Sequence, residues 1–116
     1  MTQRFTVDWS KIARKDLFLI IEYISLNNPA AAKRALQKIR EKAQQLNVYP
    51  ERCRIVPELQ RQGMSDYREL IIDHWRVIYK ITGNQVLVVV VIDSRRNLED
   101  ILLQRLLEIN HENPFS

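Results

Sequence analysis

This chain has little cysteine and little glycine, and each shortage argues against a class of protein. The single cysteine, Cys53, cannot form an internal disulfide, so we expect a reducing compartment, with the cytoplasm as the default. No apolar run reaches the ~18 residues of a membrane span, and the first residues lack the apolar segment of a signal peptide. Two glycines are too few for a glycine-rich phosphate loop.

Histidine and cysteine are also too sparse and too scattered to form a metal site. His74, His111 and Cys53 lie far apart in the sequence and show no metal-ligand spacing. No base that would activate the thiol is indicated near Cys53. We therefore expect no metal, no cofactor and no cysteine nucleophile.

The positive charge of the chain is unevenly distributed. The net charge is +4, but residues 1–48 hold nine basic and four acidic residues, whereas residues 49–116 hold nine and ten. The net charge is therefore +5 for residues 1–48 and −1 for residues 49–116. The excess is typical of a solvated helix face, and it does not predict a broad basic groove for nucleic acid on the second part.

The length and the apolar spacing predict one domain over residues 1–109, followed by a frayed tail over 110–116. Residues 5–9 alternate apolar and polar, as in a strand. Apolar residues at helical spacing predict helices over about 11–26 and 29–46, with Ser10 and Asn28 as N-caps. The link between these helices is so short that they must form an antiparallel hairpin.

Three strand-like runs occupy the last third of the chain, over residues 67–72, 75–81 and 86–92. The third run is apolar on both faces, so we predict that it is the central strand. Residues 48–57 form a loop bracketed by prolines, and residues 58–66 show no period and are expected to stay irregular. Asn97 is predicted to cap a final helix. The order is therefore β-α-α-β-β-β-α.

Arginines interrupt this strand-rich region at Arg68 and Arg76, and Arg95 and Arg96 follow the last strand. Arginine is costly to bury unpaired, and its planar fork suits phosphates and carboxylates. If Arg68 and Arg76 face the same side, their guanidiniums meet at one rim, and we favour a site for a charged partner there. The structural alternative pairs each arginine with one of four nearby acids: Glu69, Asp73, Asp93 or Glu99.

A metal-free ribonuclease is one chemistry that such a site could perform. It needs a base, an acid and cations that hold the charge of the phosphorane. His74 lies near the arginines and is the candidate acid or base, although an exposed turn residue is the interpretation that we favour for it. Under the ribonuclease hypothesis the catalytic residues are Arg68, Arg76, Arg95 and His74.

Three segments together resemble the RelE/ParE superfamily of toxins from bacterial type II toxin–antitoxin systems, over about residues 5–107. They are Tyr49-Pro50-Glu51-Arg52; Tyr67-Arg68-Glu69-Leu70 with Trp75-Arg76-Val77-Ile78-Tyr79; and Val91-Ile92-Asp93-Ser94-Arg95-Arg96-Asn97-Leu98. The resemblance implies an α+β fold with a helical hairpin packed on a mainly antiparallel four-stranded sheet. It also implies a plasmid-stabilisation-type module, in which a cognate antitoxin wraps and blocks the toxin, with higher-order assembly left open.

The resemblance leaves two activities open. RelE-like members cleave mRNA on the ribosome, and Arg68, Arg76 and Arg95 match their basic positions. However, Leu70 stands where a strand lysine is expected, and residues 101–103 stand where a tyrosine is expected.

ParE-like members instead bind and poison DNA gyrase, and they often carry an arginine-rich segment before an ordered C-terminal helix. Arg95, Arg96 and the helix predicted from residue 97 fit that pattern better. Gyrase binding through Arg95 and Arg96 is therefore the favoured hypothesis. Cleavage of mRNA, and an inactive relative that binds only its antitoxin, are the alternatives.

Overall fold

The computed structural model of the chain describes residues 3–109. In chain order the elements are β1 (Thr6–Trp9), α1 (Lys11–Ser25), α2 (Pro29–Gln44), the 3-10 turns η1 (Gln45–Asn47) and η2 (Pro50–Arg52), α3 (Pro57–Gln60), β2 (Tyr67–Ile72), β3 (Trp75–Thr82), β4 (Gln85–Asp93) and α4 (Leu98–Ile109). The predicted α+β class and order are confirmed. One expectation was wrong, because the segment expected to be irregular begins inside α3, which Pro57 starts at its first position. The predicted frayed tail, residues 110–116, lies outside the described residues.

The helical hairpin begins at two side-chain caps that the sequence predicted. The Ser10 hydroxyl accepts a hydrogen bond from the N–H of Ala13 at 3.1 Å. The Asn28 carboxamide oxygen accepts one from the N–H of Ala31 at 3.0 Å. Each cap satisfies an N–H that has no partner inside its own helix. The two helices therefore start where local chemistry sets them, and they pack against each other.

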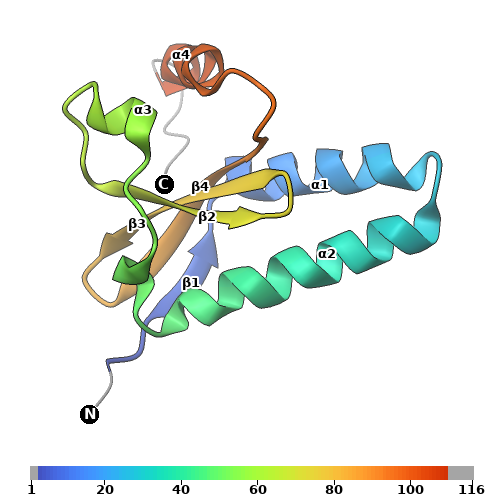
Figure 1. The fold of residues 1–116 in the computed structure, drawn as a ribbon, viewed down its shortest axis with the longest axis horizontal. Helices are drawn as coiled ribbons and strands as arrows, with labels where there is room; N and C mark the ends of the chain where they lie inside the picture. Colours follow the sequence, from blue (N-terminus) through green and yellow to red (C-terminus); the bar gives the residue numbers. More distant parts are fainter. Residues whose placement is uncertain (1–2, 110–116) are drawn as a thin grey trace.

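The four strands form one sheet in the order β1-β4-β3-β2 (Figure 1). β1 is parallel to β4, and the other two pairings are antiparallel. β4 is therefore an interior strand, as its apolar faces predicted. In the β3–β4 pairing, Ile78 lies opposite Val90 and Tyr79 lies opposite Val88, so Val89 is an extra residue in β4.

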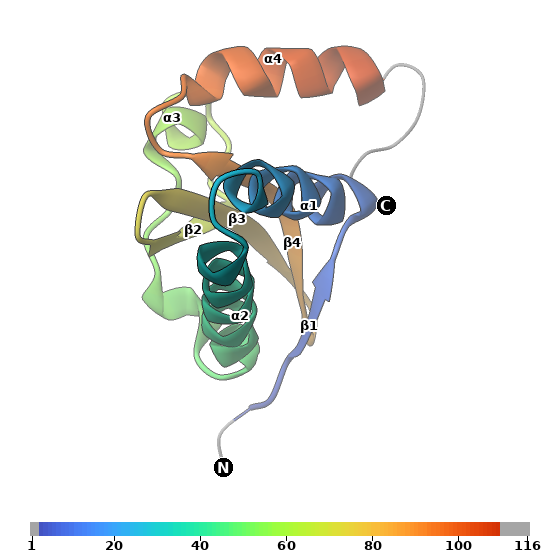
Figure 2. The same ribbon diagram turned by 90° about the vertical axis from the view of Figure 1, so that its right-hand side faces the viewer.

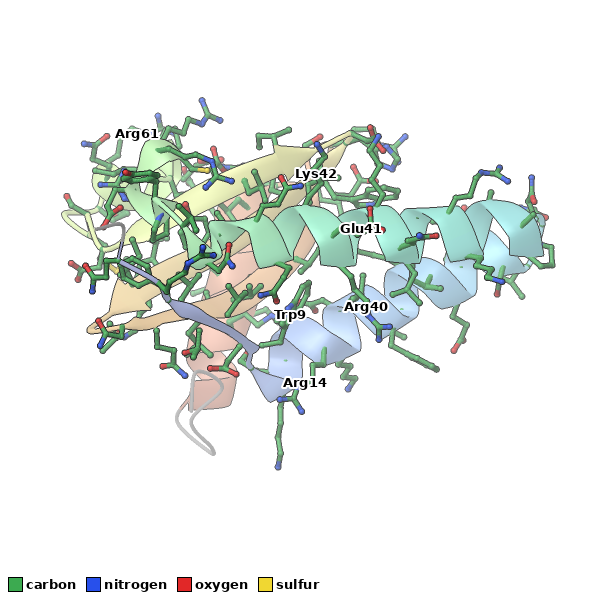
Figure 3. All side chains as sticks on the ribbon, turned by 90° about the horizontal axis from the view of Figure 1, so that it is seen from below. Trp9, Arg14, Arg40, Glu41, Lys42 and Arg61 are labelled. Carbon is green, nitrogen blue, oxygen red and sulfur yellow. The ribbon has the colours of Figure 1, made fainter. Side chains whose placement is uncertain are left out.

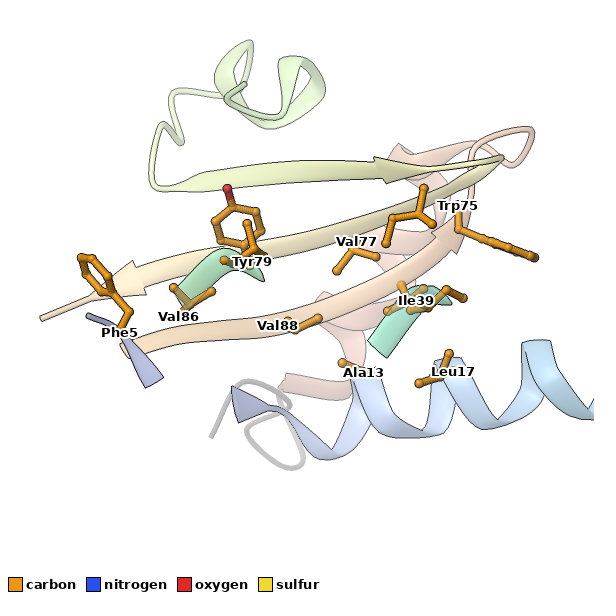
Figure 4. Packing of buried hydrophobic residues seen from close by; sticks show 12 residues of the cluster. Phe5, Ala13, Leu17, Ile39, Trp75, Val77, Tyr79, Val86 and Val88 are labelled. Carbon is orange, nitrogen blue, oxygen red and sulfur yellow. The ribbon is translucent and has the colours of Figure 1, made fainter. Parts of the chain in front are cut away.

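The sheet buries both of its faces. On one face, Val77, Tyr79 and Val88 pack against Ile39 of α2 and Leu17 of α1 (Figure 4). The other face carries a second cluster, in which strand residues meet α3 and α4: Val56, Leu59, Ile78, Val89, Val90, Ile92, Leu98 and Ile101. α4 lies across the sheet from α2 (Figures 1 and 2). Both clusters use β4, and this explains its continuous apolar run.

Beyond the end of β1, Ser10 and Asp16 bind backbone groups along the same edge of β4. The N–H of Ser10 donates to the carbonyl of Val88 at 2.9 Å. Six residues further on, a carboxylate oxygen of Asp16 accepts from the N–H of Val91 at 3.1 Å. The other oxygen of Asp16 binds the guanidinium of Arg105 in α4. Asp16 therefore ties α1 to both the sheet and the final helix.

The hairpin is longer than the sheet that it covers. Its helices have 15 and 16 residues, about 22–24 Å at the usual helical rise. Figure 1 shows both of them continuing past the ends of the strands. The tip of the hairpin therefore lies beyond the sheet, and Leu26 at the tip is 77% exposed. No helix within residues 3–109 is long and apolar enough to cross a membrane.

Candidate functional site

The two strand arginines do not form one site, and the expected convergence was wrong. Arg68 lies opposite Tyr79 in the β2–β3 pairing, whereas Arg76 lies opposite Ile71. Residues 68 and 71 are an odd number of positions apart on one strand, so their side chains point to opposite faces. Arg68 therefore lies on the face of the sheet that packs against α1 and α2. Arg76 lies on the opposite face, which packs against α3 and α4.

Arg76 is held between two carboxylates. Its Nε donates to Glu69 at 2.6 Å, and its Nη1 and Nη2 donate to the two oxygens of Glu58 at 2.7 and 2.8 Å. The side chains of Arg76 and Glu69 are only 8% and 0% exposed. Glu69 also binds Arg54. The pairing of Arg76 with Glu69 confirms the structural alternative, whereas the role of Glu58 was missed because residues 58–66 gave no periodic signal.

These contacts alter the acid chemistry of Glu58. The hydrogen bonds from Arg76 lower the pKa of Glu58 from 4.5 to about 2, against a smaller opposing effect of burial. Burial alone would have raised the pKa of Glu58, so the net lowering is due to the guanidinium of Arg76. Glu58 and Glu69 in turn raise the pKa of Arg76. Arg76 is therefore a fixed cation that fastens α3 to the sheet.

We expect Glu58 to make folding stability depend on acid. A carboxyl with a lowered folded pKa stabilises the fold fully above its unfolded value of 4.5, and this contribution is lost as the pH falls towards about 2. The measurement compares urea unfolding of the wild type and Glu58→Gln between about pH 5 and pH 2. The free energy of unfolding should fall more steeply in the wild type; parallel curves would contradict the assignment.

Arg68 is also occupied, on the other face. Its Nη1 donates to the backbone carbonyls of Glu51 at 3.0 Å and Cys53 at 2.6 Å. Beside it, the Tyr79 hydroxyl donates to the carbonyl of Pro50 at 2.5 Å, and burial raises the pKa of Tyr79. Arg68 and Tyr79 therefore anchor the loop of residues 50–53 to the sheet. Cys53 is half-buried and carries a free thiol.

The other three predicted residues, His74, Arg95 and Arg96, do come together. They lie at the end of the sheet that carries the β2–β3 turn and the end of β4. His74 sits in the two-residue turn between β2 and β3, whose first residue, Asp73, has a φ of 53°. The carbonyl of His74 accepts a hydrogen bond of 2.7 Å from the N–H of Ser94, just after β4. This bond brings the turn beside the segment that carries Arg95 and Arg96. All three predicted side chains line one groove.

This hairpin groove has a volume of about 940 Å3. Apolar side chains of α1 and α2 line it: Leu19, Ile20, Tyr23, Ile24, Ala31 and Ala35. The strands contribute Trp75, Val91 and Ile92. The sequence contained one signal for it, because α1 carries more apolar residues than one buried stripe needs. Among them, Leu19 and Tyr23 remain largely exposed.

Arg95 lies at the rim in a bidentate pair with Asp93. Its Nε donates to Asp93 Oδ1 at 2.9 Å, and its Nη2 donates to Oδ2 at 2.5 Å. This guanidinium holds the pKa of Asp93 well below its usual range. The Arg95 side chain is still 75% exposed. The pairing predicted as the structural alternative is confirmed, but the guanidinium remains open to solvent.

The remaining cations of the groove differ in whether they are paired. Lys38 binds Asp73 at 2.8 Å. Arg34 and Arg96 also line the groove and are exposed, and neither has a carboxylate partner within residues 3–109. Together with Arg95 they leave the rim of an apolar groove positive. Such a surface can bind an acidic group without any bond being made or broken.

His74 is exposed, as expected for a turn residue, and its ring lies 4.1 Å from that of Trp75 at 44°. In the part of the chain that the structure describes, no group of three His, Cys, Asp or Glu side chains is arranged to hold a metal ion. The groove therefore presents one exposed imidazole and several guanidiniums, and its carboxylates are already bound by cations. This composition suits binding better than proton transfer.

Comparison with known proteins gives a consistent result. A family model described as the ParE toxin of the type II toxin–antitoxin system parDE matches residues 7–98. A structure of the chromosomal ParDE system from P. aeruginosa is similar, with 17% identity, a TM-score of 0.65, and coverage of 78% of this chain and 96% of that one. A second is the RelBE2 toxin–antitoxin complex from Mycobacterium tuberculosis, with 22% identity, a TM-score of 0.56, and coverage of 78% and 92%. Comparison with curated proteins finds no significant match.

Proposed function

Since this chain belongs to the ParE toxin family, we propose that it inhibits growth by binding DNA gyrase. The membership confirms the RelE/ParE resemblance and makes the chain the toxin of a type II toxin–antitoxin module. The target is the part that we infer. One observation carries the inference: the sheet arginine that a ribonuclease would need, Arg76, is buried between Glu58 and Glu69.

A ribonuclease site would require Arg68, Arg76, Arg95 and His74 to reach one phosphate. Arg68 and Arg76 point to opposite faces and are already bound to the fold. Only His74 and Arg95 share a groove. Arginine stays protonated at neutral pH, so His74 alone would have to supply both acid and base. This arrangement favours a toxin that acts by binding.

The arginines after β4 fit a binding role better. Arg95 and Arg96 are consecutive exposed residues in the segment between β4 and α4. Asp16 holds α4 in place through Arg105. A backbone that is already ordered need not be immobilised when a partner binds, so the entropic cost is limited to the two side chains. We assign the contact with gyrase to Arg95 and Arg96, and such a target places the toxin in the cytoplasm.

The antitoxin is the second partner. The similar solved structures come from the ParDE system and the RelBE2 complex, which supports an antitoxin for this chain as well. The hairpin groove offers apolar walls and the unpaired guanidiniums of Arg34 and Arg96. An acidic amphipathic segment would complement both features. Bound there, it would cover Arg95 and Arg96 and block access to the target.

Two assays on purified protein test the proposed target. Gyrase supercoiling with accumulation of cleaved DNA reports poisoning, and primer extension on translating ribosomes reports mRNA cleavage. We expect cleaved gyrase–DNA complexes and no codon-specific cuts, with His74→Ala as active as the wild type. Codon-specific cuts that disappear in His74→Ala, with gyrase unaffected, would reverse the assignment to a RelE-type endonuclease.

A further inference from the structure

The outward face of α1 carries large apolar side chains that are open to solvent. Phe18, Leu19, Tyr23 and Leu26 are 63%, 51%, 73% and 77% exposed. Figure 1 shows α2 along one side of α1, and no described element along the opposite side of its second half. Exposed apolar side chains that gather on one surface mark an interaction site, whereas single ones need no explanation. The outward face of α1 is therefore a candidate contact surface.

Charged side chains share this face with the apolar ones. Lys11, Lys15, Phe18 and Glu22 are four, three and four residues apart, so they form one line along the helix. The three charged residues are exposed, and none of them forms an ion pair within residues 3–109. Together with a leucine beside this line and a leucine that continues it, they make up the α1 strip: Lys11, Lys15, Phe18, Leu19, Glu22 and Leu26.

The charges of α1 are reversed relative to those that stabilise a helix. Acidic side chains are favourable at the N-terminal end and basic side chains at the C-terminal end, because of the helix dipole. The first turn of α1 instead holds Lys11 and Arg14 and no acid, and the last turn holds Glu22 and no base. Figure 3 shows Arg14 extending from that first turn away from α2. A second helix with the same charges, packed antiparallel, would bring the favoured charge to each end.

We propose that the α1 strip pairs with the same strip of a second copy of this chain, with the two helices antiparallel. The two-fold axis passes between Phe18 and Leu19, so these side chains of both copies meet at the centre. Lys15 and Glu22 are equally distant from that axis, so each Lys15 faces Glu22 of the other copy. The α1 strip is therefore complementary to itself, and this selects a second copy as its occupant.

Lys11 completes the pairing at both ends of the strip. It lies opposite Leu26 of the other copy, where its stem covers the leucine and its ammonium approaches the C-terminal carbonyls of that helix. Each copy has a net charge of +4, but this repulsion is screened beyond about 8 Å at physiological salt. The contacts of the strip therefore decide the outcome. One helix from each copy makes a small interface, so we expect a weak dimer with a Kd in the micromolar range.

The pairing has a consequence for the antitoxin. Leu19 belongs to the α1 strip and also lines the hairpin groove, so a second copy and a segment bound in the groove compete for it. The antitoxin should therefore dissociate the dimer. This consequence rests on the proposed antitoxin site, whereas the pairing itself does not. Arg95 and Arg96 lie outside the strip, so poisoning of gyrase should not depend on the pairing.

The experiment is sedimentation equilibrium of the purified chain alone over a concentration series. We expect Lys15→Glu and Glu22→Lys each to weaken self-association at least tenfold, because each variant turns two attractive contacts into two repulsive ones. An equimolar mixture of the two variants should form a heterodimer about as readily as the wild type dimerises. In the mixed pair opposite charges again face each other at both contacts, and an effect within a single chain would not produce this recovery.

The matched controls are Lys33→Glu and Glu41→Lys, which make the same charge changes at exposed positions of α2 outside the strip. Each should change self-association less than about twofold, and mixing them should give no gain. Phe18→Asp removes the apolar centre at an exposed position and should leave a folded monomer.

Three results would overturn the inference. One is a wild-type chain that stays monomeric into the millimolar range. Another is a dimer that neither the two reversals nor their mixture changes. The third is a free chain that shows no slowing of amide exchange in α1 as its concentration rises, but shows it with the protein encoded by the neighbouring gene. That result would make the antitoxin the occupant of the strip and would leave the antitoxin proposal standing.

Discussion

Replacement of both Arg95 and Arg96 by alanine is expected to lower the accumulation of cleaved gyrase–DNA complexes by at least about 100-fold. Arginine is enriched among the residues that dominate binding interfaces, and each such residue commonly contributes tenfold or more. Both guanidiniums are exposed at the rim of the hairpin groove, ahead of a helix that is tied to α1. The measurement is a dose series of purified toxin in the gyrase cleavage assay.

The two single variants should differ. Arg95 must give up part of its bidentate pair with Asp93 when it binds a partner, whereas Arg96 has no carboxylate to release within the described residues. We therefore expect Arg96→Ala to cost more activity than Arg95→Ala. The matched control is Lys11→Ala/Lys15→Ala, which removes two exposed charges from α1 outside the hairpin groove. Wild-type potency in the folded Arg95/Arg96 double variant would remove these residues from the target site.

The largest loss of stability is expected from Glu69→Ala. The Glu69 side chain is fully buried and joins Arg76 to Arg54. Removal of one partner from a buried ion pair costs about 3–5 kcal/mol, because the remaining charge keeps its desolvation penalty. Glu58 still neutralises Arg76, so we expect a value near the lower end, about 3 kcal/mol. At the usual urea dependence this lowers the unfolding midpoint by roughly 1–3 M.

Glu51→Ala is the matched control for that prediction. Glu51 is an exposed carboxylate in the preceding loop, and only its backbone carbonyl is bound by Arg68. Loss of its side chain should change the free energy of unfolding by less than about 0.5 kcal/mol. Equal midpoints for Glu69→Ala and the wild type would mean that the buried network contributes nothing net to the fold.

The helices and strands were predictable because their signals are local. Ser10 and Asn28 cap helices by bonding to an N–H three residues ahead, and such contacts need no tertiary structure. The apolar run of β4 predicted an interior strand, since a strand covered on both faces has no polar side. The segment before β2 escaped prediction because α3 is only four residues long and gives no periodic pattern.

The sequence also placed His74, Arg95 and Arg96 in neighbouring links at the ends of strands, and the fold brings them to one groove. The sequence could not show which face of the sheet Arg68 and Arg76 occupy. Alternation along one strand does not reveal how that strand is aligned with its neighbour. That register sends Arg68 and Arg76 to opposite faces.

The sequence by itself determined the four strands, the three long helices, their order and the family resemblance, because each depends on residues close together in the chain. Only the tertiary structure decided which arginines are free. Arg76 meets Glu58 from 18 positions away, and Arg105 meets Asp16 from 89 positions away. Such pairs form only when packing brings distant segments together, and the same packing leaves the hairpin groove open. The availability of a charge for a partner is therefore a property of the fold.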